Sequence, residues 1–439
     1  MAEGQLVQAI REAAHLIGGG RADHAGVIEM ARDARFVLLG EATHGTHDLY
    51  RERARITQRL IEELGFNGVA IEADWPDADR VNRWCQGLSD DGDAEEALRG
   101  FRRFPTWMWR NTVVVDFAGW LRERNESSHE RPVLFHGMDL YSLHSSVEAV
   151  LDYLQRVDPE AAERAQGRYA CFEIGGRAED SQAYGRAVRL GVGRDCEKEA
   201  VAQLVELHQR ASGTLDPDLF SAEQNARLAR NAEAYYRAMF GSRISTWNLR
   251  DRHMAETLEN IAAYLERRDG YARIVVWAHN SHLGDARATQ MGEDGELNVG
   301  QLVRERHGRE ALLVGFTTSE GTVTAADDWG GPGERMRVRS PLPESVEALL
   351  HEVGLPRFFL PLRDAAGPLA ALRSQTMLER AIGVIYRPRT ERYSHYFDAR
   401  VGEQFDALVH VDRSRAVEPL ERTQLWDDTE APETYPSAL

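Results

Sequence analysis

The chain has 439 residues, a formal net charge of −18 at pH 7, 42% hydrophobic residues and 28% charged residues. Its length allows two or three domains, and its composition is that of an ordinary globular protein. The net negative charge differs from the positive potential of a nucleic-acid binder, and it disfavours binding to an anionic membrane surface. Neither nucleic acid nor a membrane is therefore expected as a partner. No signal peptide and no apolar window near the ~20 residues that cross a bilayer are visible, which predicts a cytoplasmic protein.

The cysteines give no sign of a site. Cys85, Cys171 and Cys196 are odd in number and contain no C-x-x-C spacing. This pattern predicts neither a disulfide framework nor a zinc site, and it fits a protein of the reducing cytosol.

The first chemical signature follows an apolar run of strand length, residues 36–39, which stops at Gly40. Glu41 and His44 come directly afterwards, before a pattern typical of a helix. Reactive side chains emerge at the carboxyl ends of strands in an open α/β sheet, so these two should lie on one loop and share a proton or a water. The simpler interpretation is a polar turn in which the histidine caps the helix, and residue types alone leave both open.

The helix that follows carries a candidate cation. Its apolar positions keep helical spacing until Gly65, which has the place of a C-cap glycine. Three arginines lie in its early turns, where a guanidinium could reach back over the loop and clamp a carboxylate. We predict that one of them, Arg53, lies within salt-bridge range of Glu41 or Glu72, because two carboxylates facing one cleft need a cation to stay ionised.

Three later apolar runs repeat the arrangement of the first. Their ends carry carboxylates or imidazoles: Glu72 and Asp74 after residues 69–71, Asp139 after residues 133–138, and His279 and His282 after residues 274–278. Because the carboxyl ends of parallel strands meet at one edge of a sheet, four such runs predict one active-site rim built from separate loops. For His279 and His282 the alternative is a pair of histidines that only hold loops by hydrogen bonds.

An aromatic cluster lies between residues 101 and 120. Aromatic side chains at helical spacing bury a large area, so most of this cluster is expected in the core. The alternative is an apolar wall for a bulky substrate, with Trp107 or Trp109 lining a cleft.

The distribution of strand and helix patterns predicts the fold. Strand-like and helix-like stretches alternate over residues 1–143 and 269–421, which indicates an α/β catalytic core with a mainly parallel central sheet flanked by helices. Residues 144–268 contain almost no strand pattern, so we predict a large helical insertion that acts as a lid over the carboxyl edge of the sheet. A helix is expected near residues 375–380, and the acidic residues 422–439 should form a flexible tail.

Motifs of several other enzyme classes are absent from the sequence. It has no G-x-S-x-G nucleophile elbow, no H-E-x-x-H pair, no P-loop and no G-x-G-x-x-G after a strand. Nucleophilic serine or cysteine catalysis therefore has no local support. What remains is a site of histidines and carboxylates that acts on water.

The combination of motifs resembles the erythromycin esterase family. The residues that carry the resemblance are Gly40-Glu41-Ala42-Thr43-His44, Arg53, Ile71-Glu72, Trp109-Arg110-Asn111, His136-Gly137-Met138-Asp139, Asn248-Leu249-Arg250-Asp251, Ala278-His279-Asn280-Ser281-His282 and Phe405-Asp406-Ala407-Leu408. The resemblance spans residues 36–411, nearly the whole chain. It implies an α/β catalytic domain with a helical lid, and metal-independent hydrolysis of a macrolide lactone.

By this resemblance, His44 matches the general base of the family, and the other matching active-site positions are Glu41, Arg53, Glu72, His279 and His282. An imidazole titrates near neutral pH, which suits it to taking a proton from water. Glu41 or Glu72 would orient the imidazole. Arg53 or a protonated His279 would stabilise the negative charge that develops on the carbonyl oxygen, and His282 would protonate the leaving alkoxide.

Two alternatives stay open beside this leading prediction of a cofactor-free hydrolase that acts on a small-molecule ester or lactone. Tiki-type metalloproteases are distant relatives of similar fold, so Glu41, His44, Glu72 and His279 could instead ligate Zn²⁺ or Mn²⁺. The chain could also be a non-catalytic binder that holds a large apolar ligand under the helical lid. No oligomeric state is predicted.

Overall fold

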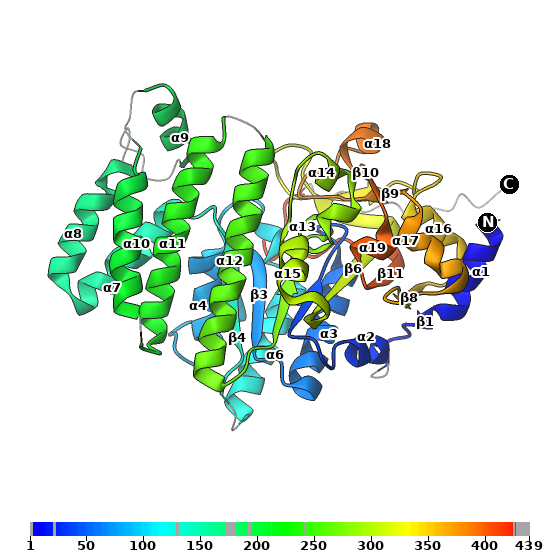
Figure 1. Ribbon diagram of the computed structural model, residues 1–439, viewed down its shortest axis with the longest axis horizontal. Helices are drawn as coiled ribbons and strands as arrows, with labels where there is room; N and C mark the ends of the chain where they lie inside the picture. The colour runs from blue at the N-terminus through cyan, green and yellow to red at the C-terminus, as the bar shows by residue number, and fades with distance from the viewer. Residues whose placement is uncertain are drawn as a thin grey trace.

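The computed structural model describes residues 3–20, 23–128, 131–172, 181–191, 195–211, 213–240, 243–424 and 426. In these residues a nine-stranded sheet has the order β1-β8-β11-β6-β2-β5-β3-β4, with β7 paired to β6 (Figure 1). The strands are β1 (His15–Leu16), β2 (Phe36–Leu39), β3 (Gly68–Asp74), β4 (Leu134–Asp139), β5 (Ile274–Trp277), β6 (Ala311–Ala325), β7 (Glu334–Val338), β8 (Arg357–Pro361) and β11 (Ala407–Ser414). The strands from β11 to β4 pair in parallel, whereas β8 runs antiparallel to β1 and β11, and β7 to β6. The predicted α/β class with a mainly parallel sheet is confirmed.

The central strands are buried on both faces, which explains their continuous apolar sequences. In β2, Phe36 and Leu38 pack into a core shared with the helical insertion, while Val37 and Leu39 pack into a second core on the opposite face. A parallel sheet covered by helices on both sides requires such runs, because neither face meets water.

Helices cover both faces of the sheet. Outside the insertion they are α1 (Glu3–Ala13), α2 (Ala25–Met30), α3 (His47–Leu64), α4 (Trp75–Cys85), α5 (Ala94–Ala97), α6 (Thr112–Ser127), α13 (Asn280–Leu283), α14 (Gln290–Glu293), α15 (Val299–His307), α16 (Val346–Glu352), α17 (Ala371–Ser374), α18 (Glu391–Ser394) and α19 (Val401–Gln404). Helix α3 ends at Gly65 in the left-handed conformation with φ 68°, so the predicted C-cap is confirmed. Within the described part of the chain, no helix combines the length and apolar character needed to cross a bilayer.

The helical insertion comprises α7 (Leu143–Val157), α8 (Pro159–Tyr169), α9 (Ser181–Arg189), α10 (Glu197–Ala211), α11 (Pro217–Ala238) and α12 (Arg243–Asp269). Where residues 144–268 are described, they form no strand. Helix α12 packs on β4 and β3, and the other helices lie beyond β4, at the left of Figure 1. Most of the insertion therefore lies beside the sheet, and the start of α12 is a part that reaches the carboxyl edge. Its action as a lid stays a prediction.

The prediction of a helix near residues 375–380 is wrong. This segment contains strand β9 (Met377–Arg380), which pairs antiparallel with β10 (Tyr396–Ala399) in a second, small sheet. Met, Leu, Glu and Arg favour helix, but tertiary contacts override this weak preference. The buried Arg380 guanidinium donates to the backbone carbonyls of Thr318 and Ser319 at 2.7 and 2.5 Å, which ties the strand to β6.

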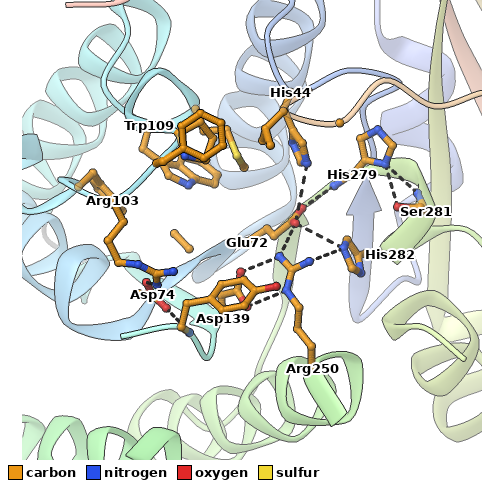
Figure 2. A pocket seen from close by; sticks show the side chains of 18 of the residues that line it. His44, Glu72, Asp74, Arg103, Trp109, Asp139, Arg250, His279, Ser281 and His282 are labelled. Atoms are coloured by element: carbon orange, nitrogen blue, oxygen red, sulfur yellow. Dashed lines mark hydrogen bonds and ion pairs between the residues drawn. The ribbon is translucent and has the colours of Figure 1, made fainter. Parts of the chain in front are cut away.

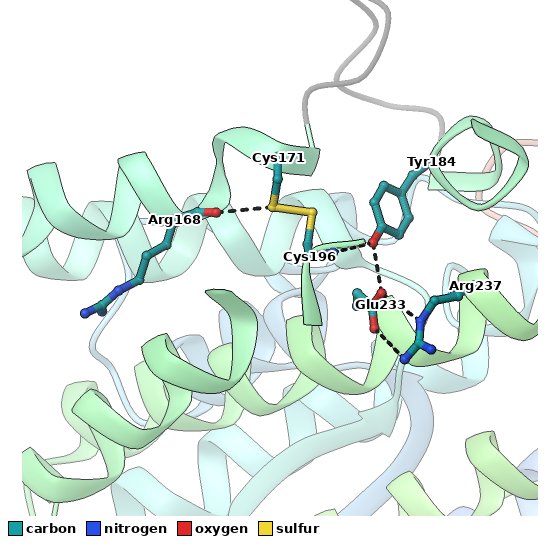
Figure 3. Close-up of a disulfide and its surroundings, with 6 residues drawn as sticks. All are labelled: Arg168, Cys171, Tyr184, Cys196, Glu233 and Arg237. Atoms are coloured by element: carbon teal, nitrogen blue, oxygen red, sulfur yellow. Dashed lines mark hydrogen bonds and ion pairs between the residues drawn. A yellow bond between two sulfur atoms is a disulfide. The ribbon is translucent and has the colours of Figure 1, made fainter. Parts of the chain in front are cut away.

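The expectation that the cysteines form no disulfide is also wrong. Cys171 and Cys196 are joined by a disulfide across 25 residues, between the ends of helices that pack together, α8 and α10 (Figure 3). Beside it, the backbone amide of Cys196 donates to the Tyr184 hydroxyl at 2.9 Å. The pairing arises from tertiary packing, so spacing and an odd count could not reveal it. Cys85 is buried and free. Residues 427–439 of the predicted tail lie outside the described residues.

Candidate active site

A pocket of about 380 Å³ opens at the carboxyl edge of the sheet (Figure 2). The loops after β2, β3, β4 and β5 meet the start of α12 there. Its acidic and basic lining residues are His44, Glu72, Asp74, Asp77, Arg103, Asp139, Arg250, His279 and His282. The four strand ends singled out by sequence thus meet at one pocket.

Gly40 and Asn280 hold two of these loops together. A Cβ atom at Gly40 would lie 2.1 Å from Asn280 Oδ1, so a residue without a side chain is required there. Asn280 Nδ2 donates to the Phe316 carbonyl at 2.8 Å, and Asn280 Oδ1 accepts from the Phe316 amide at 3.2 Å. The loop that carries His279 and His282 is therefore fixed against β2 and β6.

His44 lies on the loop between β2 and α3 and is oriented from behind. Its Nδ1 lies 2.7 Å from Glu41 Oε1, and Arg53 Nη1 lies 2.9 Å from Glu41 Oε2. The Arg53 side chain is 1% exposed and packs over the rings of Tyr50 and Trp277. The ion pair predicted between Arg53 and Glu41 is confirmed, although the two groups do not align as a hydrogen bond.

The other ring nitrogen of His44 faces the pocket. Its Nε2 lies 4.0 Å from Glu72 Oε1, and the ring centroid lies 4.8 Å from that of His279. Within the described residues this nitrogen makes no hydrogen bond. With Nδ1 held by Glu41, Nε2 is the nitrogen of His44 that can act on a ligand or a water.

Glu72, at the end of β3, is an ionised carboxylate. Its Oε1 accepts from Arg250 Nη2 at 2.6 Å, and its Oε2 accepts from the His279 backbone amide at 2.9 Å. Burial alone would raise the pKa of Glu72, but the charges of His282, His44 and Arg250 outweigh it and lower the pKa well below the usual range.

His279 is a neutral imidazole. Burial, followed by the charge of His44, lowers the pKa of His279 to about 3. Its Nδ1 lies 2.9 Å from Ser281 Oγ and accepts from the Ser281 amide at 3.2 Å, which leaves the proton on Nε2. This Nε2 is buried without a well-formed hydrogen bond in the described residues, and the Ala42 carbonyl also faces the ring. The lowered pKa opposes the protonated state of His279, which was expected, as an alternative to Arg53, to meet the negative charge on the carbonyl oxygen.

Arg250, from α12, connects the acidic groups of the pocket. Its Nε and Nη2 donate to the two oxygens of Asp139 at 2.9 and 2.7 Å, and its Nη1 lies 2.9 Å from His282 Nε2. His282 Nδ1 in turn lies 2.8 Å from Asp251 Oδ1, and Trp247 stacks on the His282 ring at 4.5 Å. One guanidinium thus links two carboxylates and an imidazole.

The protonation of His282 is set by opposing groups. Burial lowers its pKa, but the carboxylates of Asp251 and Glu72 raise it above the usual value. Arg250 opposes this, because its N–H can donate only to an unprotonated Nε2. In either state the Nε2 of His282 faces Arg250, unlike the Nε2 of His44.

Comparisons with known proteins agree with this fold. The sequence profile described as erythromycin esterase matches residues 61–414, which is most of the chain. The chain belongs to the erythromycin esterase family. This membership supports a hydrolase activity. The matched residues include Glu72, His279 and His282, whereas Glu41, His44 and Arg53 precede them.

Individual members and structures of similar fold are distant. The chain is 21% identical to an erythromycin esterase type II of Escherichia coli, over 88% of this chain and 91% of the relative. A crystal structure described as a succinoglycan biosynthesis protein superposes with a TM-score of 0.78 at 20% identity, covering 95% of this chain and 98% of that one. An erythromycin esterase mutant in its open conformation superposes with a TM-score of 0.63 at 16% identity, covering 89% and 93%. At these identities the structural likeness shows the fold alone.

The six site residues predicted from the sequence of this chain fall into two groups in the structure. His44, Glu72, His279 and His282 line the pocket. Glu41 and Arg53 lie behind His44, so Arg53 does not meet a substrate carbonyl directly.

Sequence reasoning placed Asp139 on the predicted active-site rim, but it assigned no chemical role to Asp139, Arg250, Asp251 or Trp247. A usable signal existed for three of them: Asp139 ends a strand, and Arg250 and Asp251 belong to a motif shared with the erythromycin esterase family. Nothing in the local sequence pointed to Trp247.

Proposed function

We propose that this protein hydrolyses a carboxylic ester or lactone with a water molecule that His44 activates. The observation that carries the proposal is the Nε2 of His44, which lies in the pocket 4.0 Å from Glu72 Oε1 without a hydrogen bond in the described residues, while Glu41 holds Nδ1 at 2.7 Å. In this arrangement the Glu41 carboxylate fixes the tautomer and stabilises the imidazolium that forms. Arg53 holds Glu41 in place from the buried side.

The reaction balances with the groups present. The water oxygen bonds to the carbonyl carbon while its proton moves to His44 Nε2, and negative charge develops on the carbonyl oxygen. A hydrogen-bond donor to that oxygen is typically worth ~3–4 kcal/mol, and His279 supplies one from Nε2 only by turning from the Ala42 carbonyl that faces its ring. The intermediate then expels the alkoxide, which takes the proton from His44, and the products are an acid and an alcohol.

Glu72 and Arg250 define the charge of the site and do not exchange protons in this scheme. The lowered pKa of Glu72 keeps its carboxylate ionised, so it can orient the attacking water by accepting a hydrogen bond. All three nitrogens of Arg250 are engaged, by Glu72, Asp139 and His282, so Arg250 joins the ends of β3 and β4 to His282.

The geometry favours water activation over metal ligation. Among the described residues, no three His, Cys, Asp or Glu side chains converge as metal ligands. Glu41 is engaged by His44 and Arg53, and the guanidinium of Arg250, 2.6 Å from Glu72, opposes a second cation at that carboxylate.

A screen of esters and lactones, read by mass spectrometry for addition of one water, tests the proposal. We expect turnover by the wild type, no loss after chelation, and loss of turnover without loss of folding in His44→Ala. Activity that disappears on chelation and returns with Zn²⁺ or Mn²⁺ would establish a metal-dependent hydrolase instead. Saturable binding of substrates without any turnover would establish a binder.

A further inference from the structure

A second cavity, of about 300 Å³, lies on the side of the helical insertion, where α4, β4, α11 and α12 pack together (Figure 1). No described residue lines both this cavity and the pocket at the carboxyl edge. Leu134 and His136 line it from β4, and alternate residues of a strand point to the same face of the sheet. The volume is that of a small-molecule site, and the proposed hydrolysis uses none of its residues.

His136 brings an unsatisfied polar group to this cavity. The residue is 3% exposed, and neither ring nitrogen has a hydrogen-bond partner within the described part of the chain. Burial, followed by the charge of Arg268, lowers the pKa of His136 to about 3, so the imidazole is neutral. One nitrogen then carries a hydrogen and the other accepts one. Buried polar groups are normally paired, and a hydroxyl group of a ligand can pair with either nitrogen.

Other polar side chains of the lining are already paired. Asp79 Oδ2 accepts from Ser221 Oγ at 3.0 Å, and Ser221 Oγ accepts from Trp75 Nε1 at 3.0 Å. Asn82 Oδ1 accepts from the Phe135 amide at 3.0 Å. These contacts hold α4, α11 and β4 together, which distinguishes them from the unpaired imidazole of His136.

The wall beside His136 is aromatic. The rings of Phe220 and Tyr264 stack with centroids 4.2 Å apart and planes inclined by 9°. Phe220 also lies edge-to-face to the His136 ring at 6.1 Å. Leu134 and Pro217 extend the apolar lining. Such a wall suits a flat apolar ring, because aromatic pairs add to the free energy of burying their area.

The charge of the lining favours an anion, although the whole chain has a net charge of −18. The charged lining residues are Arg83, Arg131, Arg268 and Asp79. Arg83 pairs with Asp218 at 2.6 Å. Arg268 and Arg131, however, share one carboxylate, that of Asp269, at 2.7 and 3.5 Å. Two guanidiniums on one carboxylate leave a positive charge in excess, and the 60% exposed side chain of Arg131 brings it to the mouth of the cavity.

We propose that this second cavity binds a small aromatic carboxylate that also carries a hydroxyl group. The ring lies against Phe220 and Tyr264, the hydroxyl pairs with His136, and the carboxylate meets the guanidiniums of Arg131 and Arg268. This binding is independent of hydrolysis at the pocket on the carboxyl edge.

Three probes of similar shape test the proposal by isothermal titration calorimetry at neutral pH. They are 3-(4-hydroxyphenyl)propionate, 3-phenylpropionate, which lacks the hydroxyl, and 3-(4-hydroxyphenyl)propionamide, which lacks the charge. We expect the wild type to bind the first more tightly than the second by about fivefold, as for one net hydrogen bond. The preference for the acid over its amide should be at least about fivefold, because charge-assisted hydrogen bonds are stronger. Equal binding of the three probes, or binding of none, would overturn the proposal and leave a cavity that holds water only.

Two variants assign the two preferences to residues. His136→Phe keeps a ring of similar size, and it should lose the preference for the hydroxyl but keep the preference for the acid over the amide. Arg131→Gln should do the reverse, and because its side chain is exposed it tests the proposal even if His136→Phe does not fold. The matched control Arg156→Gln changes an exposed arginine of α7 outside the cavity and should keep both preferences. An unchanged hydroxyl preference in folded His136→Phe, or an unchanged acid preference in Arg131→Gln, would overturn the proposal.

A third variant separates this cavity from the pocket at the carboxyl edge. His44→Ala should bind all three probes as the wild type does, whether or not the protein hydrolyses any ester. Loss of probe binding in His44→Ala, with His136→Phe unaffected, would place the probes in the other pocket and overturn the proposal. A wild type that shows both preferences but hydrolyses no ester or lactone would defeat the proposed function and leave this site standing.

Discussion

Two halves of the pocket hold a histidine in the same way but turn it toward different groups. His44 and His282 each place Nδ1 beside a buried carboxylate, at 2.7 Å from Glu41 and 2.8 Å from Asp251. The Nε2 of His44 lies in the pocket 4.0 Å from Glu72 Oε1 and makes no hydrogen bond in the described residues. The Nε2 of His282 lies 3.4 Å from the same oxygen and is engaged by Arg250 Nη1 at 2.9 Å. An imidazole backed by a carboxylate is therefore not enough to identify a general base. The group opposite its other nitrogen decides whether it can act on water.

The largest expected effect is a loss of turnover, and it tests the difference between His44 and His282 directly. His44→Gln should lower kcat by about 10²–10⁴-fold, because it removes the general base. His282→Gln should cost at least about tenfold less, because the Nε2 of His282 is already engaged and takes no proton from water. The measurement is kcat and KM for both variants on one established substrate. Equal losses in kcat would show that the two histidines share the proton transfer.

Arg250→Met should have the next largest effect, on stability. It leaves the buried carboxylates of Glu72 and Asp139 without their cation, and breaking such a pair typically costs about 3–5 kcal/mol. The free energy of unfolding is measured by urea denaturation. Arg250→Lys is the matched control, since it keeps the charge but loses the fork geometry, and it should recover part of the loss. A stability of Arg250→Met equal to that of the wild type would mean that the two carboxylates take up protons at no cost.

The same comparison shows how far sequence reasoning reaches. His44, Glu72, His279 and His282 follow strands, and parallel strands bring their carboxyl ends to one edge, so their convergence could be predicted. Arg250 lies 178 residues from Glu72 and 111 from Asp139, and only the packing of α12 on β3 and β4 brings it to them. The neutral state of His279 depends on burial, which no local pattern encodes.

Predictions from local sequence patterns were also wrong where tertiary contacts outweigh the local preference. Strand β9 consists of residues that favour helix, and the Cys171–Cys196 disulfide joins segments that only folding makes adjacent. By contrast, the buried strands and the Gly65 cap follow from local chemistry, and both were predicted.

The smallest expected effect concerns a third histidine, His136 in β4, which has no carboxylate beside it. Both of its ring nitrogens are buried without a hydrogen-bond partner in the described residues, and its ring stacks on Trp75 at 4.5 Å. Burial, followed by the charge of Arg268, lowers the pKa of His136 to about 3. It thus shows what burial does to an imidazole without the carboxylate that His44 and His282 possess.

His136→Phe should flatten the pH dependence of stability. Above its unfolded pKa of about 6.5, His136 is neutral in both states and contributes nothing to the pH dependence. Between pH 6.5 and about 3, the unfolded chain binds a proton that the folded chain excludes, so stability falls as pH falls, by up to about 1.4 kcal/mol per pH unit. Phenylalanine keeps the stack on Trp75 and removes this proton.

Urea denaturation of both proteins between pH 6.5 and 4.5 measures the difference. The slope of the free energy of unfolding against pH should be about 1 kcal/mol per pH unit shallower in the variant. A His15→Phe control, on an exposed strand, should keep the wild-type slope. Parallel slopes for the wild type and His136→Phe would show that His136 takes up its proton in the folded protein. A carboxylate would then not be needed to keep His136 protonatable in the folded protein.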